Sequence, residues 1–206
     1  RAIWRSGAIV KFVHLALSAE RSASLVERVI QAQHTCAGYE GVYLSDEVDE
    51  PLTAGVWRQA IVLPASKISA LKPLEIQAVI AHERAHISRF DPSKNLALQI
   101  VQCVFWFNWP LLSLIRSYER SREFDCDRRA VEGGVKPTAL GKALAKLAIS
   151  KSGPAIGLAL TGHYSDVASR IRELTDPKAA AWPSAAVTVL LLGVIATLLL
   201  WTFAAM

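Results

Sequence analysis

The spacing of hydrophobic positions changes along the chain and predicts a mainly helical protein with one short region of β-structure. Residues 22–33 place their apolar side chains on one side at helical spacing, which predicts a short amphipathic helix. Residues 42–44 and 56–63 are rich in β-branched and apolar side chains, and an acidic, turn-rich stretch at 45–51 separates them. The pattern from 38 to 64 therefore predicts a small β-sheet of two or three strands.

A helix that is apolar nearly all round is predicted from Pro73 to about Arg89. Pro73 suits the first turn, because proline lacks only an amide that would be unpaired there. Apolar residues occupy most positions around this helix, and such a helix is normally buried in the protein. The Asp91-Pro92 pair ends it, since the residue before a proline is disfavoured in the helical conformation.

A second long apolar stretch, at residues 96–115, contains no charged side chain. It predicts a helix, but Gln99, Gln102 and Asn108 favour one that is half buried in protein, or lies at a membrane interface, over one that spans a bilayer. A polar helix follows at 117–131 and ends at two glycines. Further helices are predicted at 138–150 and 165–174.

Residues 185–206 form the clearest candidate for a membrane span. About 22 residues at roughly 1.5 Å each give about 33 Å, which matches the roughly 30 Å hydrocarbon core of a bilayer. Trp182 and Trp201 lie near its two ends, as interfacial anchors do. Basic side chains precede this stretch and no charged residue follows it, so the positive-inside rule predicts that the domain faces the cytoplasm.

Composition and charge narrow the class of partner. Of the 206 residues, 52% are hydrophobic, which is high for a soluble domain. The net charge of +5 arises from scattered Lys and Arg without an aromatic-interleaved basic patch, so we expect a lipid bilayer as a partner and no nucleic acid. The three cysteines are too irregularly spaced for a disulfide framework or a thiolate zinc site, which favours a reduced compartment.

The sequence His82-Glu83-Arg84-Ala85-His86 carries the clearest chemistry. Histidines four positions apart lie on one face of a helix, so both imidazoles can reach one zinc ion. Glu83 projects beside them, where it can act as the general base toward zinc-activated water. Burying these polar side chains in an apolar helix is costly unless they bind something. We therefore expect one Zn²⁺ per chain and the chemistry of a hydrolytic peptidase.

A zinc peptidase needs a third protein ligand, and the spacing leaves two candidates. No third histidine follows at the metzincin spacing, so a carboxylate from a second helix is required, as in gluzincins. Glu119, Glu123 and Asp127 fall on one face of the helix predicted at 117–131. The alternative is a solvated acidic stripe that pairs with neighbouring arginines. Spacing alone does not choose between Glu119 and Glu123 as the ligand.

Several segments together resemble the BlaR/MecR-type membrane metallopeptidases of bacteria. That family combines HExxH, an aspartate five residues later, a Trp-Phe-Asn-Pro-like segment and Glu-x-x-Cys-Asp. The corresponding positions here are residues 82–86, Asp91, residues 105–110 and residues 123–127. Residues 55–64 also resemble the family's Gly-x-x-x-Pro-x-Ile-x-x-Pro segment. The departures from the family pattern are Arg84, the inserted Trp109, and Gln59 in place of a proline.

The resemblance implies a gluzincin-type fold and a role for each matching residue. Glu123 would be the third zinc ligand, Asp127 would orient a ligand histidine from behind, and Cys126 would be packed without binding the metal. Asp91 would cap and fix the end of the helix that carries HExxH. The resemblance also implies a zinc-dependent endopeptidase of the bacterial inner membrane that cleaves a cytoplasmic protein, such as a repressor in a signalling pathway.

Three parts of the chain are expected on this basis. Residues 1–20 are a membrane-proximal segment that we expect to be truncated, with native sequence before Arg1. Residues 21–178 form the zinc metallopeptidase domain, which is mainly α with a small β-sheet. Residues 183–206 form the C-terminal transmembrane helix.

The binding of substrate and the overall role leave alternatives open. The strand predicted at 56–63 would be either an edge strand that binds a peptide substrate, with Gly55, Val56 and Trp57 as contact residues, or an ordinary strand that covers the helix carrying HExxH. Arg170, with its neighbours His163 and Tyr164, is a weaker candidate for stabilising the oxyanion. The rival roles are a component of a signal transducer and a catalytically silent, zinc-stabilised membrane scaffold. Glu83 argues against the scaffold, because a structural zinc needs no base.

Overall fold

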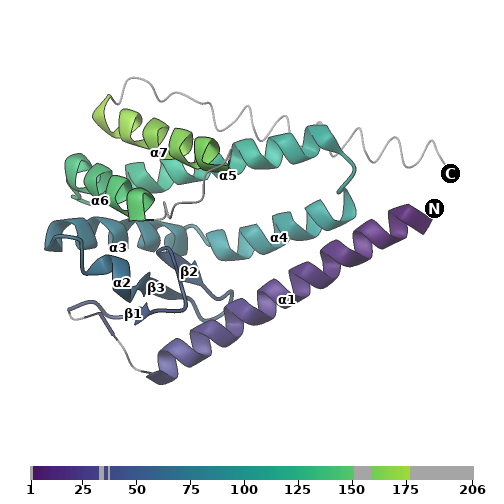
Figure 1. Ribbon diagram of the computed structural model, residues 1–206, viewed down its shortest axis with the longest axis horizontal. Helices are drawn as coiled ribbons and strands as arrows, with labels where there is room; N and C mark the ends of the chain where they lie inside the picture. Colours follow the sequence, from purple (N-terminus) through teal and green to yellow (C-terminus); the bar gives the residue numbers. More distant parts are fainter. Residues whose placement is uncertain (1, 33–34, 37, 151–158, 177–206) are drawn as a thin grey trace.

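Helices packed around a three-stranded sheet make up the protein (Figure 1). The computed structural model describes residues 2–32, 35–36, 38–150 and 159–176. Its strands are β1 (Val42–Ser45), β2 (Leu52–Ala54) and β3 (Ala60–Pro64). Its helices are α1 (Ala2–Ala32), α2 (Ala65–Ile68), α3 (Pro73–Ser88), α4 (Asp91–Val104), α5 (Trp109–Glu132), α6 (Pro137–Ser150) and α7 (Ala159–Thr175). The prediction of a mainly α fold with a small β-sheet is confirmed.

The sheet has the strand order β1-β3-β2, so β3 lies in its centre. β1 pairs parallel to β3 and β2 pairs antiparallel to it. Side chains alternate between the two faces of a strand, and the packing follows that rule. Ile61 and Leu63 belong to a cluster with Val79 of α3, whereas Val62 packs with Val26 of α1 on the other face. Because β3 is covered on both faces, every one of its residues is buried.

The strand predicted at 56–63 is shorter than expected and lies in the centre of the sheet, so the alternative of an edge strand is wrong and that of a strand covering the helix agrees with the structure. It begins at Ala60, because residues 55–59 form the turn that joins β2 to β3. Gly55 enters this turn with a φ of +87°, and a Cβ atom there would collide with the backbone carbonyl of Arg58. Since β3 is paired on both sides, the edge strands are β1 and β2, and β2 packs against α3.

The helix predicted from Pro73 is confirmed and forms the centre of the packing. The backbone N–H of Lys72 donates to Glu75 Oε2 at 2.8 Å, which satisfies an amide at the start of α3. Lys146 of α6 also pairs with this carboxylate, at 2.7 Å. Buried side chains lie on most sides of α3, since it packs against the sheet, α4, α5 and α6. The nearly uniform apolar pattern therefore reflects contact on several faces.

The single helix predicted over residues 96–115 is wrong, because the chain breaks there into a hairpin of two helices. α4 ends at Val104 and α5 begins at Trp109. The Asn108 side chain accepts a hydrogen bond from the backbone N–H of Leu111 at 3.0 Å, which caps the start of α5. Pro110 then occupies the first turn of α5, where proline is tolerated at a helix start. α5 is consequently longer than the polar helix predicted at 117–131.

The N-terminal helix also extends further than its apolar pattern predicted. α1 covers 31 residues, including most of the expected membrane-proximal segment, and packs against α4 and the sheet. Within the described chain, none of the helices combines the length and the apolar character needed to cross a membrane. The transmembrane helix predicted at 183–206 lies outside the described residues.

Candidate metal centre

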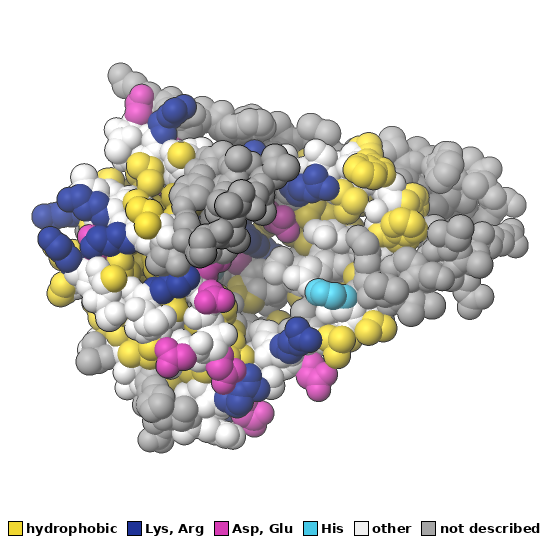
Figure 2. All heavy atoms as spheres, viewed as in Figure 1, with side chains coloured by type: hydrophobic (Ala, Val, Ile, Leu, Met, Phe, Trp, Pro, Cys, Tyr) yellow, Lys and Arg dark blue, Asp and Glu magenta, His cyan; other side chains and the backbone are white. Residues whose placement is uncertain are grey.

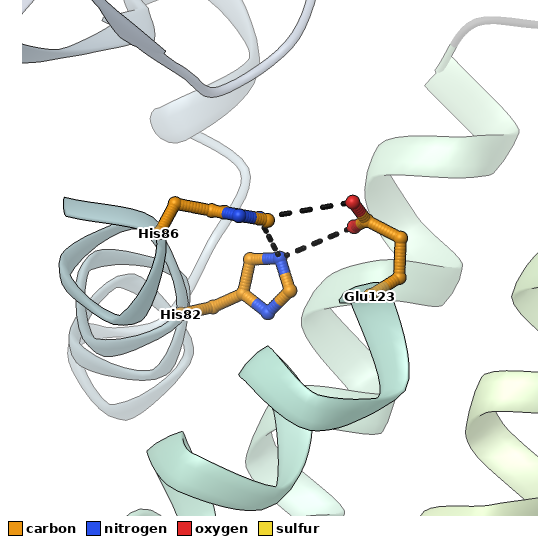
Figure 3. A group of neighbouring side chains, drawn as sticks. All are labelled: His82, His86 and Glu123. Atoms are coloured by element: carbon orange, nitrogen blue, oxygen red, sulfur yellow. Dashed lines mark hydrogen bonds and ion pairs between the residues drawn. The ribbon is translucent and has the colours of Figure 1, made fainter. Parts of the chain in front are cut away.

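Two imidazoles project from one face of α3 toward α5 (Figure 3). His82 and His86 are one helical turn apart, and their Nε2 atoms lie 3.2 Å from each other. The His82 side chain is 8% exposed and that of His86 is 13% exposed. The helical spacing predicted from the sequence thus brings both rings to one place.

The Glu123 carboxylate reaches the same place from α5. Its Oε2 lies 3.6 Å from His82 Nε2 and its Oε1 lies 3.8 Å from His86 Nε2. Ligand atoms bound at about 2.0–2.1 Å around a tetrahedral zinc are separated by about 3.3 Å. The three donor groups are therefore spaced nearly as zinc ligands are. Glu119, the alternative from spacing, lines the neighbouring cavity and is not a member of this three-residue group.

Two aspartates hold the far sides of the imidazole rings. Asp127 Oδ1 lies 2.8 Å from His82 Nδ1, and Asp91 Oδ2 lies 2.8 Å from His86 Nδ1. A carboxylate at Nδ1 accepts the N–H there, which leaves the Nε2 lone pair available to a metal. Both lone pairs would then point at each other, an arrangement that favours a cation between them. The family resemblance implied that Asp127 orients a ligand histidine, and its carboxylate lies beside His82.

Asp91 has a part in the site that the sequence reading missed. It was expected to cap a helix end, yet its carboxylate contacts His86, Arg89 and the thiol of Cys126. The short distance to His86 depends on the residue between the two helices. Phe90 adopts the left-handed conformation, with φ 57° and ψ 35°, which reverses the chain sharply between α3 and α4. The signal available in the sequence was the short separation of Asp91 from HExxH.

Arg170 of α7 joins the site through Asp127. Its Nε and one terminal nitrogen each donate to an oxygen of Asp127 at 2.7 Å, and its other terminal nitrogen lies 3.5 Å from Glu123 Oε2. Burial alone would lower the pKa of Arg170, but Asp127 raises it above its usual value, so the guanidinium stays charged. Arg170 thereby offsets the negative charge that gathers behind the two imidazoles. His163 and Tyr164 have no described side chains.

The charges of the site favour a cation at the Nε2 atoms. Burial lowers the pKa of His82, yet the hydrogen bonds to Asp127 and Glu123 outweigh it and raise the value to about 9 in the metal-free protein. Burial would raise the pKa of Glu123, but His82 and Arg170 hold it well below its usual range. The Glu123 carboxylate is therefore ionised and His82 is protonated at neutral pH when no metal is bound.

Glu83 lies beside the imidazoles and is held by the edge strand. Thr53 of β2 donates its hydroxyl toward Glu83 Oε2 at 3.0 Å and toward the Glu83 backbone carbonyl at 3.2 Å. Glu83 is 6% exposed and lines a cavity of about 650 Å³. The cavity also contains the two histidines, Glu123 and Arg170, and β2 forms one of its walls. The arrangement places a carboxylate, a candidate metal position and a strand edge around one cavity.

The residues expected to contact substrate lie elsewhere. Gly55, Val56 and Trp57 line a second cavity of about 790 Å³ between α1, α4 and the β2–β3 turn. The Gly55 amide already donates to the hydroxyl of Ser22 in α1, at 3.2 Å. The two cavities share Thr53, Pro92 and Asn95 on their boundary. The structure thus brings Thr53 into the cavity that contains the histidines, whereas the three predicted residues line only the second cavity.

Cys126 is fully buried behind His86. Its sulfur lies 3.3 Å from His86 Nδ1 and 3.6 Å from Asp91 Oδ2, and these three residues form a second group of possible metal ligands. Burial raises the pKa of the thiol well above its usual value, which favours the neutral S–H over the thiolate that a metal binds. This agrees with the expectation that Cys126 is a packed residue.

A helix with HExxH, a carboxylate from a second helix and a cavity across both define a metallopeptidase-type domain. The sequence profile of the BlaR1 peptidase M56 family matches residues 2–175, and the chain belongs to this family. The resemblance inferred from the motifs is confirmed.

Individual relatives are antibiotic-resistance and regulatory proteins. The methicillin resistance mecR1 protein of Staphylococcus aureus is 26% identical over 163 residues, which cover 75% of this chain and 28% of that protein. The regulatory protein BlaR1 of Bacillus licheniformis is 33% identical over 100 residues, which cover 46% of this chain and 16% of that protein. The chain therefore corresponds to less than a third of the length of these relatives.

Proposed function

We propose that the protein is a zinc-dependent endopeptidase whose metal ligands are His82, His86 and Glu123 and whose general base is Glu83. The observation that carries the proposal is the convergence of both Nε2 atoms and the Glu123 carboxylate at separations of 3.2 to 3.8 Å, beside an open cavity. Two imidazoles and one carboxylate with a free fourth position are the usual ligands of catalytic zinc.

Each surrounding residue has a task in peptide hydrolysis. When bound, zinc would polarise the peptide carbonyl and lower the pKa of water. Glu83 accepts the proton of the attacking water and returns it to the leaving amine. Thr53 fixes one oxygen of that carboxylate, so the other is free to turn toward the cavity. Asp91 and Asp127 hold the two rings with Nε2 facing the ligand position.

The edge of β2 supports a polypeptide substrate. β2 is one of the two outer strands of the sheet and forms one wall of the cavity that contains Glu83. An extended peptide can add to such an edge through main-chain hydrogen bonds, which would carry one of its peptide bonds past Thr53 toward the histidines. The apolar wall opposite, formed by α3 and α6, would accept a hydrophobic side chain.

The cellular location and the substrate of the protein are proposed from its family. Its relatives carry the names of a methicillin-resistance protein and a regulatory protein. We place the chain at the inner membrane of a bacterium, anchored by residues 183–206, with the domain in the cytoplasm. The proposed substrate is a cytoplasmic protein, such as a repressor in a signalling pathway, and nucleic acid is not a proposed partner.

The direct test measures zinc and cleavage together. Protein purified without chelator is expected to contain about one zinc per chain and to cleave a broad peptide library, and a strong chelator is expected to abolish the cleavage. His82→Ala is expected to lose both the metal and the activity. Absence of zinc from the unmutated protein would overturn the metal site. Zinc without any cleavage would instead favour the scaffold.

A Thr53→Val variant is expected to lower kcat about tenfold with little change in KM. The substitution keeps the shape of the side chain but removes the hydroxyl that donates to Glu83 at 3.0 Å, so the base is less well oriented. Steady-state kinetics with one defined peptide measure this effect. Thr53→Ser is the matched control, because it retains the hydroxyl and is expected to retain most of the activity. Equal kcat values for the valine and threonine proteins would contradict the role of Thr53.

Zinc affinity is expected to rise about tenfold per pH unit between pH 7 and 9. The pKa of His82 is about 9 without metal, so below that pH a proton must leave before the metal binds, and above it the dependence ends. Competition with a chromophoric chelator, corrected for its own protonation, measures the slope. Asp127→Asn removes one cause of the raised pKa of His82, so the zinc affinity of this variant is expected to stop rising at a lower pH. A flat affinity for the unmutated protein across this range would show that His82 is neutral.

A further inference from the structure

The exposed face of α4 is apolar, which is unusual for a helix on the surface of a protein. The outward-facing positions are Lys94, Ala97, Ile100 and Val104, at helical spacing. Ile100 is 46% exposed and Val104 is 50% exposed. The polar Gln99 instead faces the cavity beside α1. Charge is thus confined to the beginning of the exposed face, and the remainder is aliphatic.

The exposed face of α5 is also apolar near the turn between the two helices and charged away from it. It begins with Trp109, which is 77% exposed, passes Ser113 and reaches the exposed Arg116. Phe107, in the turn between the two helices, is 41% exposed. We call residues 95–115 the α4–α5 hairpin. It contains no charged side chain, and Lys94 and Arg116 stand at its two ends.

Exposed hydrophobic side chains gather at this end of the molecule. Figure 2 shows them over the α4–α5 turn, while most of the charged side chains on that face lie toward the opposite end. Among the described residues, six of the ten large hydrophobic side chains that are exposed belong to the hairpin or to the adjoining part of α1. They are Val13, Leu17, Ile100, Val104, Phe107 and Trp109. Such a concentration marks an interaction surface.

We propose that the tip of the α4–α5 hairpin inserts into one leaflet of a phospholipid bilayer, with Lys94 and Arg116 at the headgroups. From residue 95 to the end of α4 the helix rises about 15 Å, which is about half of the roughly 30 Å hydrocarbon core. The hairpin is thus long enough to enter a leaflet and too short to span. This inference rests on the proposed bilayer partner of the chain, and not on its zinc chemistry.

The chemistry of the hairpin favours lipid over a protein as its occupant. Tryptophan and phenylalanine at the tip suit the interior and interface of a bilayer, and lysine and arginine at the base complement anionic headgroups. The exposed ionic side chains that border the hairpin, Lys94 and Arg116, are both cationic. A protein partner would need one surface that matches both the apolar tip and the basic side chains at the base of α4 and α5. A lipid leaflet has an apolar interior and anionic headgroups in that order.

Insertion of the hairpin would also fix the height of the metal centre. Glu123 lies seven residues beyond Arg116 on the same helix, which corresponds to about 10 Å along the axis. With Arg116 at the headgroups, the cavity would open just above the membrane surface. The substrate is then a polypeptide segment in the aqueous phase close to the bilayer.

Photocrosslinking in vesicles identifies what covers the hairpin. The photoreactive amino acid p-benzoylphenylalanine replaces Val104 or Trp109 in the full chain, and Glu132, exposed at the far end of α5, is the control position. The proteins are reconstituted in vesicles of phosphatidylethanolamine and phosphatidylglycerol, floated, illuminated and digested for mass spectrometry. We expect phospholipid adducts at both hairpin positions, at least about tenfold above the control position. The Trp109 site is largely exposed, so its replacement is not expected to disturb folding.

The outcomes separate the possible occupants. Adducts to peptides from residues 177–206 of the same chain, or to a second copy of the chain, would overturn insertion, as would an absence of adducts in floated protein. A chain that does not float would overturn the bilayer partner as well. Loss of zinc or of cleavage with lipid adducts still present would overturn the proposed enzyme and leave the hairpin in the membrane.

Discussion

A Glu123→Ala variant is expected to lose zinc under conditions in which Glu119→Ala retains it. Glu123 brings an ionised carboxylate to within 3.6 and 3.8 Å of the two Nε2 atoms, and the alanine leaves only two protein ligands. Loss of an outer carboxylate that supports a ligand lowers metal affinity by roughly 10–100-fold. The loss of a ligand itself is expected to exceed that range. Equilibrium dialysis against a zinc buffer measures both variants.

Two further variants calibrate this comparison. Asp127→Ala and Asp91→Ala each remove a carboxylate that lies 2.8 Å from an Nδ1 atom, so each is expected to fall between Glu119→Ala and Glu123→Ala. Glu119 lies on the same side of α5 and lines the same cavity, which makes it the matched control for charge. If Glu119→Ala loses zinc and Glu123→Ala retains it, the third ligand is Glu119, one helical turn before the residue assigned here.

A Glu83→Gln variant is expected to keep its zinc and its fold while peptide cleavage falls by about 100-fold or more. The amide retains the shape of the carboxylate and can still contact Thr53, but it cannot accept a proton from water. Zinc content and thermal unfolding of the variant test whether the site is otherwise intact. The comparison therefore separates catalysis from metal-dependent structure.

Combining the two substitutions tests whether Thr53 acts through Glu83. If Thr53 acts only through Glu83, Thr53→Val is expected to have little further effect in the Glu83→Gln background, because the base is already absent. Cleavage by Glu83→Gln at the rate of the unmutated protein would refute the assigned mechanism. Loss of zinc from this variant would show instead that Glu83 contributes to metal binding.

Local signals in the sequence predicted the helix that carries the histidines and the pairing of its two rings. Helical spacing alone brings His82 and His86 together. Pro73 marks the start of the helix because proline is favoured in the first turn, where its missing N–H would be unpaired. The family resemblance favoured Glu123 over Glu119, a choice that spacing had left open, and it implied that Asp127 lies behind a ligand histidine. These parts were predictable because each depends on residues close in sequence or on a motif.

The remaining parts depend on contacts that a periodic pattern does not contain. The break at Asn108 follows from one cap and one proline inside an uninterrupted apolar run, so hydropathy alone predicted a single helix. Thr53 lies on β2, which forms one edge of the sheet while β3 lies in its centre, and strand order is a tertiary property. Asp91 reaches His86 only because Phe90 reverses the chain in a left-handed conformation.

The pairing of Arg170 with Asp127 links the metal site to the cooperativity of folding. The contact between Arg170 and His82 closes a stretch of 88 residues, and α7 supplies none of the proposed ligands. Metal binding at the histidines is therefore expected to stabilise the docking of α7 as well, because that helix supplies the Arg170 charge that neutralises the Asp127 carboxylate. Amide protons in α7 are accordingly expected to exchange with solvent more slowly when metal is added.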